Sequence, residues 1–149
     1  MFTLVPVNFF NPASAREALS GLARLKDGDR VDFKEIPQYA AVLVYVSDGS
    51  QNPPEIFYLL DELAGCQEYN KLLCSWHDGE LNMAVAQGKS LLLANSYHAP
   101  DFTTAEYYIF LALKSLQLNP EVTVIHFRHP LPEDAEMSLY RYFKSVDCK

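Results

Sequence analysis

Two histidines near the end of a predicted strand, His126 and His129, are the first residues whose type and spacing suggest chemistry. Imidazole nitrogens bind zinc and other transition metals, so two of them three positions apart could share one ion. No cysteine, aspartate or glutamate stands beside them at the spacing of further ligands, and the three cysteines include no metal-binding pair. A metal-dependent hydrolase is therefore one alternative interpretation, but the sequence predicts neither a metal centre nor a catalytic residue.

The segment His77-Asp78-Gly79-Glu80 joins two strands of the predicted meander. Asp-Gly readily adopts the positive φ values of a two-residue hairpin turn, which predicts a tight β-turn here. A plain turn is the favoured interpretation of these four residues.

The second half of the chain contains the elements that would position these residues. Three strands joined by two tight turns predict an antiparallel meander, followed by a helix, a strand and a second helix. Thr103 and Glu106 have capping-box spacing at the start of the first of these helices, which is apolar nearly all round. The predicted elements are strands 71–76, 81–87 and 90–97, helix 103–118, strand 122–127, a helix after Glu133, and a short strand 146–148.

The first half is predicted to contribute two strands and two helices. Residues 2–8 are extended and apolar, and Asn11-Pro12 has the pattern of a helix start with Asn as N-cap. Residues 40–46 are continuously apolar, which is typical of a strand buried on both faces in a parallel sheet. The second helix follows Pro54. Only two parallel strands would leave a bare sheet edge, so we expect dimerisation or a longer natural chain.

The fold class is α/β with a mixed sheet, and the second half has the element order of a ribonuclease H-like unit. Three parts of the chain also resemble an uncharacterised bacterial family with an actin-like ATPase fold: strand Leu4-Val5-Pro6 with Phe9-Phe10, strand segment 88–97, and helix 103–118 with Asn119-Pro120-Glu121. The resemblance implies a partial first lobe at 1–66 and a complete ribonuclease H-like second lobe at 67–149. It also implies that the family's upstream β-β-β-α unit is missing here. That family has no assigned activity.

The resemblance implies that His77, Asp78, Gly79 and Glu80 are the candidate cofactor-binding position, at a degenerate phosphate loop. Actin-like ATPases hold nucleotide phosphates in hairpin loops of the type Asp-x-Gly-Thr/Ser, one in each lobe. The hairpin here has Asp78 directly before Gly79, and Glu80 stands where a hydroxyl residue belongs. A carboxylate at that position would repel phosphate. A divergent nucleotide-binding ATPase-like protein is therefore an alternative function and not the leading one.

Net charge and composition disfavour further classes of function. The 149 residues carry a net charge of −7, which disfavours a nucleic-acid partner. The sequence shows neither the pattern of a signal peptide nor an apolar run of about 18 residues, so we expect no membrane partner. The odd cysteine count fits a reducing cytoplasm. We expect a cytoplasmic, non-catalytic protein without a cofactor that acts through protein–protein contacts, as a homo-oligomer or with another protein.

Overall fold

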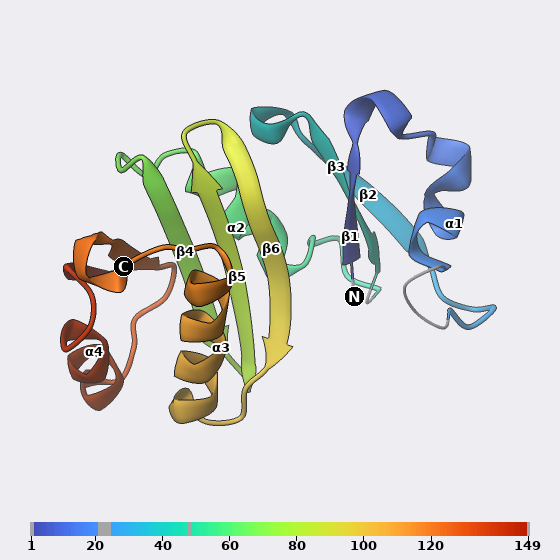
Figure 1. Cartoon of the computed structure of the whole chain (residues 1–149). Helices are drawn as coiled ribbons and strands as arrows, with labels where there is room; N and C mark the ends of the chain where they lie inside the picture. Colours follow the sequence, from blue (N-terminus) through green and yellow to red (C-terminus); the bar gives the residue numbers. More distant parts are fainter. Residues whose placement is uncertain (1, 21–24, 48, 149) are drawn as a thin grey trace.

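Two β-sheets lie side by side in the computed structural model, which describes residues 2–20, 25–47 and 49–148 (Figure 1). The strands are β1 Phe2–Pro6, β2 Val31–Ile36, β3 Ala41–Val46, β4 Asn70–His77, β5 Glu80–Gln87, β6 Ser90–His98, β7 Val124–Phe127 and β8 Ser145–Cys148. The helices are α1 Ala15–Ser20, α2 Glu55–Leu63, α3 Phe102–Ser115 and α4 Glu133–Tyr140. The five-stranded sheet lies between α3 on one face and α2 on the other (Figure 1).

The five-stranded sheet has the strand order β6-β5-β4-β7-β8. Strands β4, β5 and β6 form the predicted antiparallel meander, while β7 pairs in parallel with β4 and β8 in parallel with β7. The turn between β4 and β5 has positive φ at both Asp78 (51°) and Gly79 (73°), as a two-residue hairpin requires. The predicted tight turn at this position is confirmed.

The three-stranded sheet differs from the prediction for the first half. Its order is β1-β3-β2, and both outer strands run antiparallel to β3. Strand β3 is deeply buried, as its apolar run indicates, but the parallel arrangement was wrong. The chain reverses through the turn Pro37–Tyr39 and a left-handed Ala40 (φ 50°), which lays β2 directly against β3. Strand β2 itself was not predicted, and because β1 and β2 flank β3, the expected bare edge beside β3 does not exist.

Helix α3 begins two residues earlier than the proposed capping box implies. Its N-cap is Asp101, whose Oδ1 accepts hydrogen bonds from the Thr104 amide at 2.8 Å and the Thr104 hydroxyl at 2.9 Å. The box between Thr103 and Glu106 was wrong, because the carboxylate one turn before Thr104 already satisfies the exposed amide. Among the described residues, no helix is long and apolar enough to cross a membrane.

Helix α2 connects the two sheets. It buries four apolar side chains, each of which contributes roughly 1.5–3 kcal/mol to folding: Ile56, Leu59, Leu60 and Leu63. They share one core cluster with Leu43 and Tyr45 of the three-stranded sheet and with Leu73 and Ala84 of the five-stranded sheet. A second cluster fills the space between the five-stranded sheet and α3. The division into lobes at residues 66 and 67 stays a prediction.

Candidate functional site

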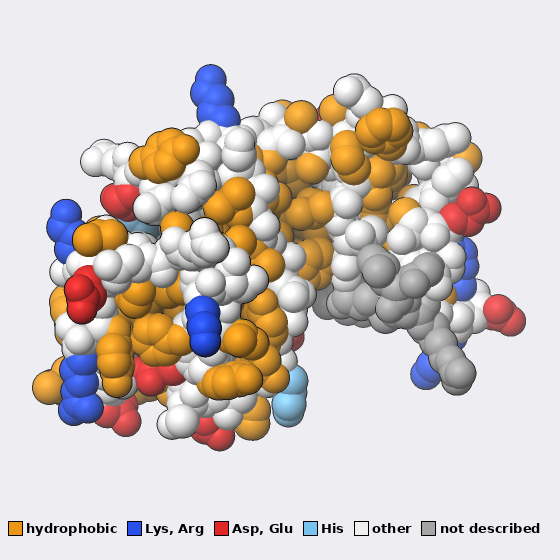
Figure 2. Space-filling model, in the orientation of Figure 1, with side chains coloured by type: hydrophobic (Ala, Val, Ile, Leu, Met, Phe, Trp, Pro, Cys, Tyr) orange, Lys and Arg blue, Asp and Glu red, His pale blue; other side chains and the backbone are white. Residues whose placement is uncertain are grey.

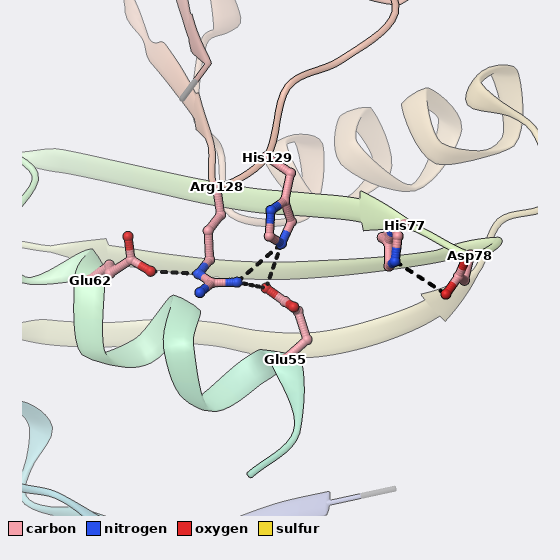
Figure 3. A network of polar contacts seen from close by, with 6 residues as sticks. All are labelled: Glu55, Glu62, His77, Asp78, Arg128 and His129. Carbon is pink, nitrogen blue, oxygen red and sulfur yellow. Dashed lines mark hydrogen bonds and ion pairs between the residues drawn. The ribbon is translucent and has the colours of Figure 1, made fainter. Parts of the chain in front are cut away.

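The hairpin predicted as a phosphate-loop position lies at one end of the five-stranded sheet (Figure 3). His77 and Asp78 are strongly exposed, and the His77 Nε2 atom lies 3.2 Å from Asp78 Oδ2. Glu80 pairs in register with His77 on one side and with His98 on the other. The described ion pair here joins two side chains of the hairpin itself. The predicted phosphate-loop position therefore presents carboxylates and imidazoles and no hydroxyl side chain.

Arg128 directly follows β7 and reaches across to helix α2. Its Nε donates to Glu62 Oε2 at 2.6 Å and its Nη1 donates to Glu55 Oε1 at 2.6 Å. The same Nη1 lies 3.0 Å from His129 Nε2, and the guanidinium carbon lies 4.6 Å from the centre of the Tyr58 ring. Figure 3 shows the guanidinium between the two carboxylates, with His129 above Glu55.

These contacts fix the charge state of Arg128. Burial by itself would lower the pKa of the guanidinium, but the hydrogen bonds and negative charges of Glu62 and Glu55 outweigh burial and raise the pKa of Arg128. The stability that this pairing supplies is present below the ordinary pKa and is lost only as pH rises through the higher folded-state pKa. Arg128 is therefore a permanent cation whose Nε and Nη1 groups are already directed at two carboxylates of α2.

The two histidines singled out as metal ligands do not share a site. The ring of His126 lies between Glu68, which contacts its Nε2, and Asp147, whose Oδ2 is 2.9 Å from its Nδ1. His129 instead joins the Arg128 and Glu55 contacts. Each histidine thus has carboxylate partners from a different part of the chain. Among residues 2–20, 25–47 and 49–148, no group of three potential ligands is arranged to hold a metal ion.

Two hollows adjoin the hairpin. One, of about 270 Å³, is lined by residues of the β4–β5 turn and the end of β6: Asp78, Gly79, Glu80, Ser96, Tyr97 and His98. The other, of about 340 Å³, lies between the two sheets and shares Glu80 and Ser96 with the first. No lysine or arginine is among the described residues that line either hollow. A phosphate group in either hollow would therefore find no lysine or arginine to pair with among the described lining residues.

The sequence pattern does not show that Arg128 contacts Glu55 and Glu62. Glu55 and Glu62 are seven positions apart on one helix, which places them on the same face two turns apart, and this spacing was a usable signal. Arg128 joins them over sequence separations of 73 and 66 residues. Only the packing of α2 against β4 and its neighbour β7 shows that this arginine is their common partner.

Comparison with solved structures defines the class of protein. A crystal structure from Bacteroides thetaiotaomicron VPI-5482, described as a protein with actin-like ATPase fold and unknown function, matches with a TM-score of 0.79 and 18% sequence identity. The match covers 99% of this chain, and the chain spans 64% of the length of that protein. The present protein therefore has an actin-like ATPase fold, and the predicted fold class is confirmed.

The family follows from the sequence match. Residues 56–146 match the model of a family described as Protein of unknown function (DUF3822), and the chain belongs to that family. A comparison with curated proteins found no match. The resemblance to an uncharacterised family with this fold is thus confirmed.

Proposed function

We propose that this protein is a non-catalytic member of the actin-like fold class that acts through protein–protein contacts in the cytoplasm. The observation that carries the proposal is the chemistry of the hairpin at the phosphate-loop position. Asp78 and Glu80 place carboxylates there, and the nearby Arg128 is held by two further carboxylates. These negative carboxylates repel phosphate, so a nucleotide cofactor, a nucleic acid and an anionic membrane surface are all disfavoured as partners.

An exposed apolar surface on α3 and α4 supports the contact function. Tyr107 and Leu111 of α3 and Tyr140 at the end of α4 are about half exposed or more. Phe110 of α3 and Tyr142, two residues after α4, meet edge-on with ring centres 5.0 Å apart. Hydrophobic side chains gather over α3 in Figure 2. Aromatic residues are enriched at protein interfaces, so this surface is the proposed contact, with a second copy of the chain or another protein as the partner.

Sedimentation of the purified chain tests the self-association part of this proposal. At high micromolar concentration the wild type should sediment as a species heavier than the 16.9 kDa chain, and the double variant Tyr107→Ser, Leu111→Ser should sediment as a monomer. Tyr69→Ser, which alters an equally exposed tyrosine on a different part of the surface, serves as the control and should sediment like the wild type. A strictly monomeric wild type would contradict self-association.

Thermal unfolding with nucleotide tests the non-catalytic part. A ligand that binds the folded state raises the melting temperature by linkage. Millimolar ATP with magnesium should leave the melting temperature unchanged, because the hairpin lacks a partner for phosphate. A reproducible rise that disappears when Gly79→Val is introduced would establish the nucleotide-binding alternative instead, and a wild-type rise with ATP hydrolysis would overturn the proposal.

A further inference from the structure

Three polar side chains form a row across the face of the five-stranded sheet that faces α2. Ser75 of β4 is directly opposite Asn82 of β5, and Asn82 is directly opposite Ser96 of β6. Residues in register on neighbouring strands point to the same face, and Leu73, two positions before Ser75, packs with α2 on that face. Ser75 is 1% exposed and Asn82 is 6% exposed. A buried polar row interrupts a face that is otherwise apolar.

The row is not satisfied by its own hydrogen bonds. The Ser96 hydroxyl donates to Asn82 Oδ1, and the Ser75 hydroxyl has no partner. The amide nitrogen of Asn82 makes no hydrogen bond with any residue that the structure describes. If the amide were turned over, its oxygen would be the free end instead, so one end is unpartnered in either orientation. The Ser75 hydroxyl is a fully buried unpartnered group, which destabilises a fold, whereas the free end of the Asn82 amide is not fully buried and is accessible to a molecule in the space that Asn82 lines.

Asn82 and Ser96 form part of the wall of the inter-sheet hollow, the space of about 340 Å³ between the two sheets. Phe2 and Tyr45 of the three-stranded sheet line its other side. Figure 2 shows hydrophobic side chains in the depression between the two halves of the molecule. The volume is at the lower end of the range for small-molecule sites, which runs from about 300 to 1,000 Å³. One wall is therefore apolar and aromatic, and the other offers an unpartnered amide.

The charges around the inter-sheet hollow are negative. Glu80 lines it and forms no ion pair with any described residue, whereas Glu55, which also lines it, is paired with Arg128. The start of α2 borders the hollow, and a helix start attracts anions, but Glu55 already occupies its first turn. A ligand that enters the hollow thus meets one uncompensated carboxylate and, among the described lining residues, no lysine or arginine.

We propose that the inter-sheet hollow binds a small organic cation, an amine or guanidine attached to an apolar body. The cationic group faces Glu80 and donates a hydrogen bond to the Asn82 amide oxygen, which keeps a second lone pair beside the Ser96 hydroxyl, and the apolar body lies against Phe2 and Tyr45. Aromatic rings add attraction for a cation placed over their faces. This inference goes beyond the proposed contact function and does not depend on it, because the surface on α3 and α4 is not part of the hollow.

Titration of the full chain with phenethylamine, followed by ligand-observed NMR and calorimetry, tests the site. Three ligands separate its features: phenethylamine carries both charge and ring, 3-phenylpropionate replaces the cation by a carboxylate, and ethylamine lacks the ring. Phenethylamine should bind at least ten-fold more tightly than either of the others. Equal binding of the acid and the amine, or the absence of phenethylamine binding at millimolar concentration, would overturn the proposal.

Variants locate the binding on the molecule. Glu80→Gln should weaken phenethylamine binding at least ten-fold, and Asn82→Ala should weaken it several-fold. Glu121→Gln, at an exposed carboxylate on the turn before β7, is the matched control and should bind as the wild type does. If Asn82→Ala fails to fold, Ser96→Ala examines the same row. Unchanged binding in Glu80→Gln would place the ligand elsewhere and refute the site.

Discussion

The two faces of the five-stranded sheet are built differently, although the same strands supply both. Towards α3, side chains such as Leu72, Leu81 and Ile109 are fully buried in a continuous apolar cluster. Towards α2, apolar packing gives way near the β4–β5 hairpin to the row of Ser75 and Asn82. The first face contributes stability through the removal of apolar surface from water. The second keeps polar groups whose bonding is incomplete, which is expected where a site is retained at some loss of stability.

The largest effect is expected on the apolar face. Ile109→Ala removes a fully buried side chain from the centre of α3, and the lost burial together with the cavity should lower the free energy of unfolding by about 2–5 kcal/mol. Urea unfolding followed by circular dichroism measures it. Leu111→Ala, at a half-exposed position of the same helix, should change the free energy by no more than about 0.5 kcal/mol. Similar losses for the two variants would mean that the α3 face is not the main core.

A smaller effect is expected from the ion pairs on the α2 side. Arg128→Met keeps much of the side-chain volume but leaves Glu55 and Glu62 without their shared cation, which should cost about 1–3 kcal/mol. Unfolding at neutral pH and moderate salt gives the value. Arg141→Met removes an exposed arginine and should be near neutral. Adding Glu55→Gln and Glu62→Gln to the Arg128→Met variant should recover part of the lost free energy of unfolding. The absence of recovery would contradict the charge-pair explanation.

The smallest effect is also the sharpest test of the contrast, because it uses neighbouring residues that point to opposite faces. Ser75→Ala removes a buried hydroxyl that has no partner, so the free energy of unfolding should stay the same or rise by up to about 1 kcal/mol. Cys74→Ser places a hydroxyl in the apolar cluster towards α3, where burial already raises the pKa of the thiol, and should lose about 1–3 kcal/mol. Chemical unfolding of both variants decides this point, and a destabilised Ser75→Ala would show that its hydroxyl is satisfied.

Local patterns in the sequence predicted the second half well. The Asp78-Gly79 turn requires positive φ, and the alternating residues on either side of it can pair only as a hairpin. Strand β2 was missed because Asp32, Lys34 and Glu35 mask the alternation of Val31 and Phe33. Those charges are tolerated because β2 is an edge strand with one side open to water. The error on β3 had a different origin, because burial on both faces occurs in a central antiparallel strand as well as in a parallel sheet.

The candidate site could be predicted only in part. The hairpin at 77–80 and its acidic composition are visible in the sequence, because a turn is a local feature. Neither the Arg128 contacts nor the row from Ser75 to Ser96 is visible there. The former join residues 66 and 73 positions apart, and the latter depends on strand register.

The sequence by itself determined which segments form helices and strands in the second half, and it placed carboxylates in the hairpin that is predicted as a phosphate-loop position. These outcomes depend on backbone preference and on the charge of single residues, which a short segment carries with it. The tertiary structure decided that β3 is flanked on both sides and that two carboxylates of α2 compensate the charge of Arg128. It also decided that a polar row with incomplete hydrogen bonding lies beside the inter-sheet hollow. Each of these depends on which distant segments pack together, because burial and ion pairing are properties of neighbours in space.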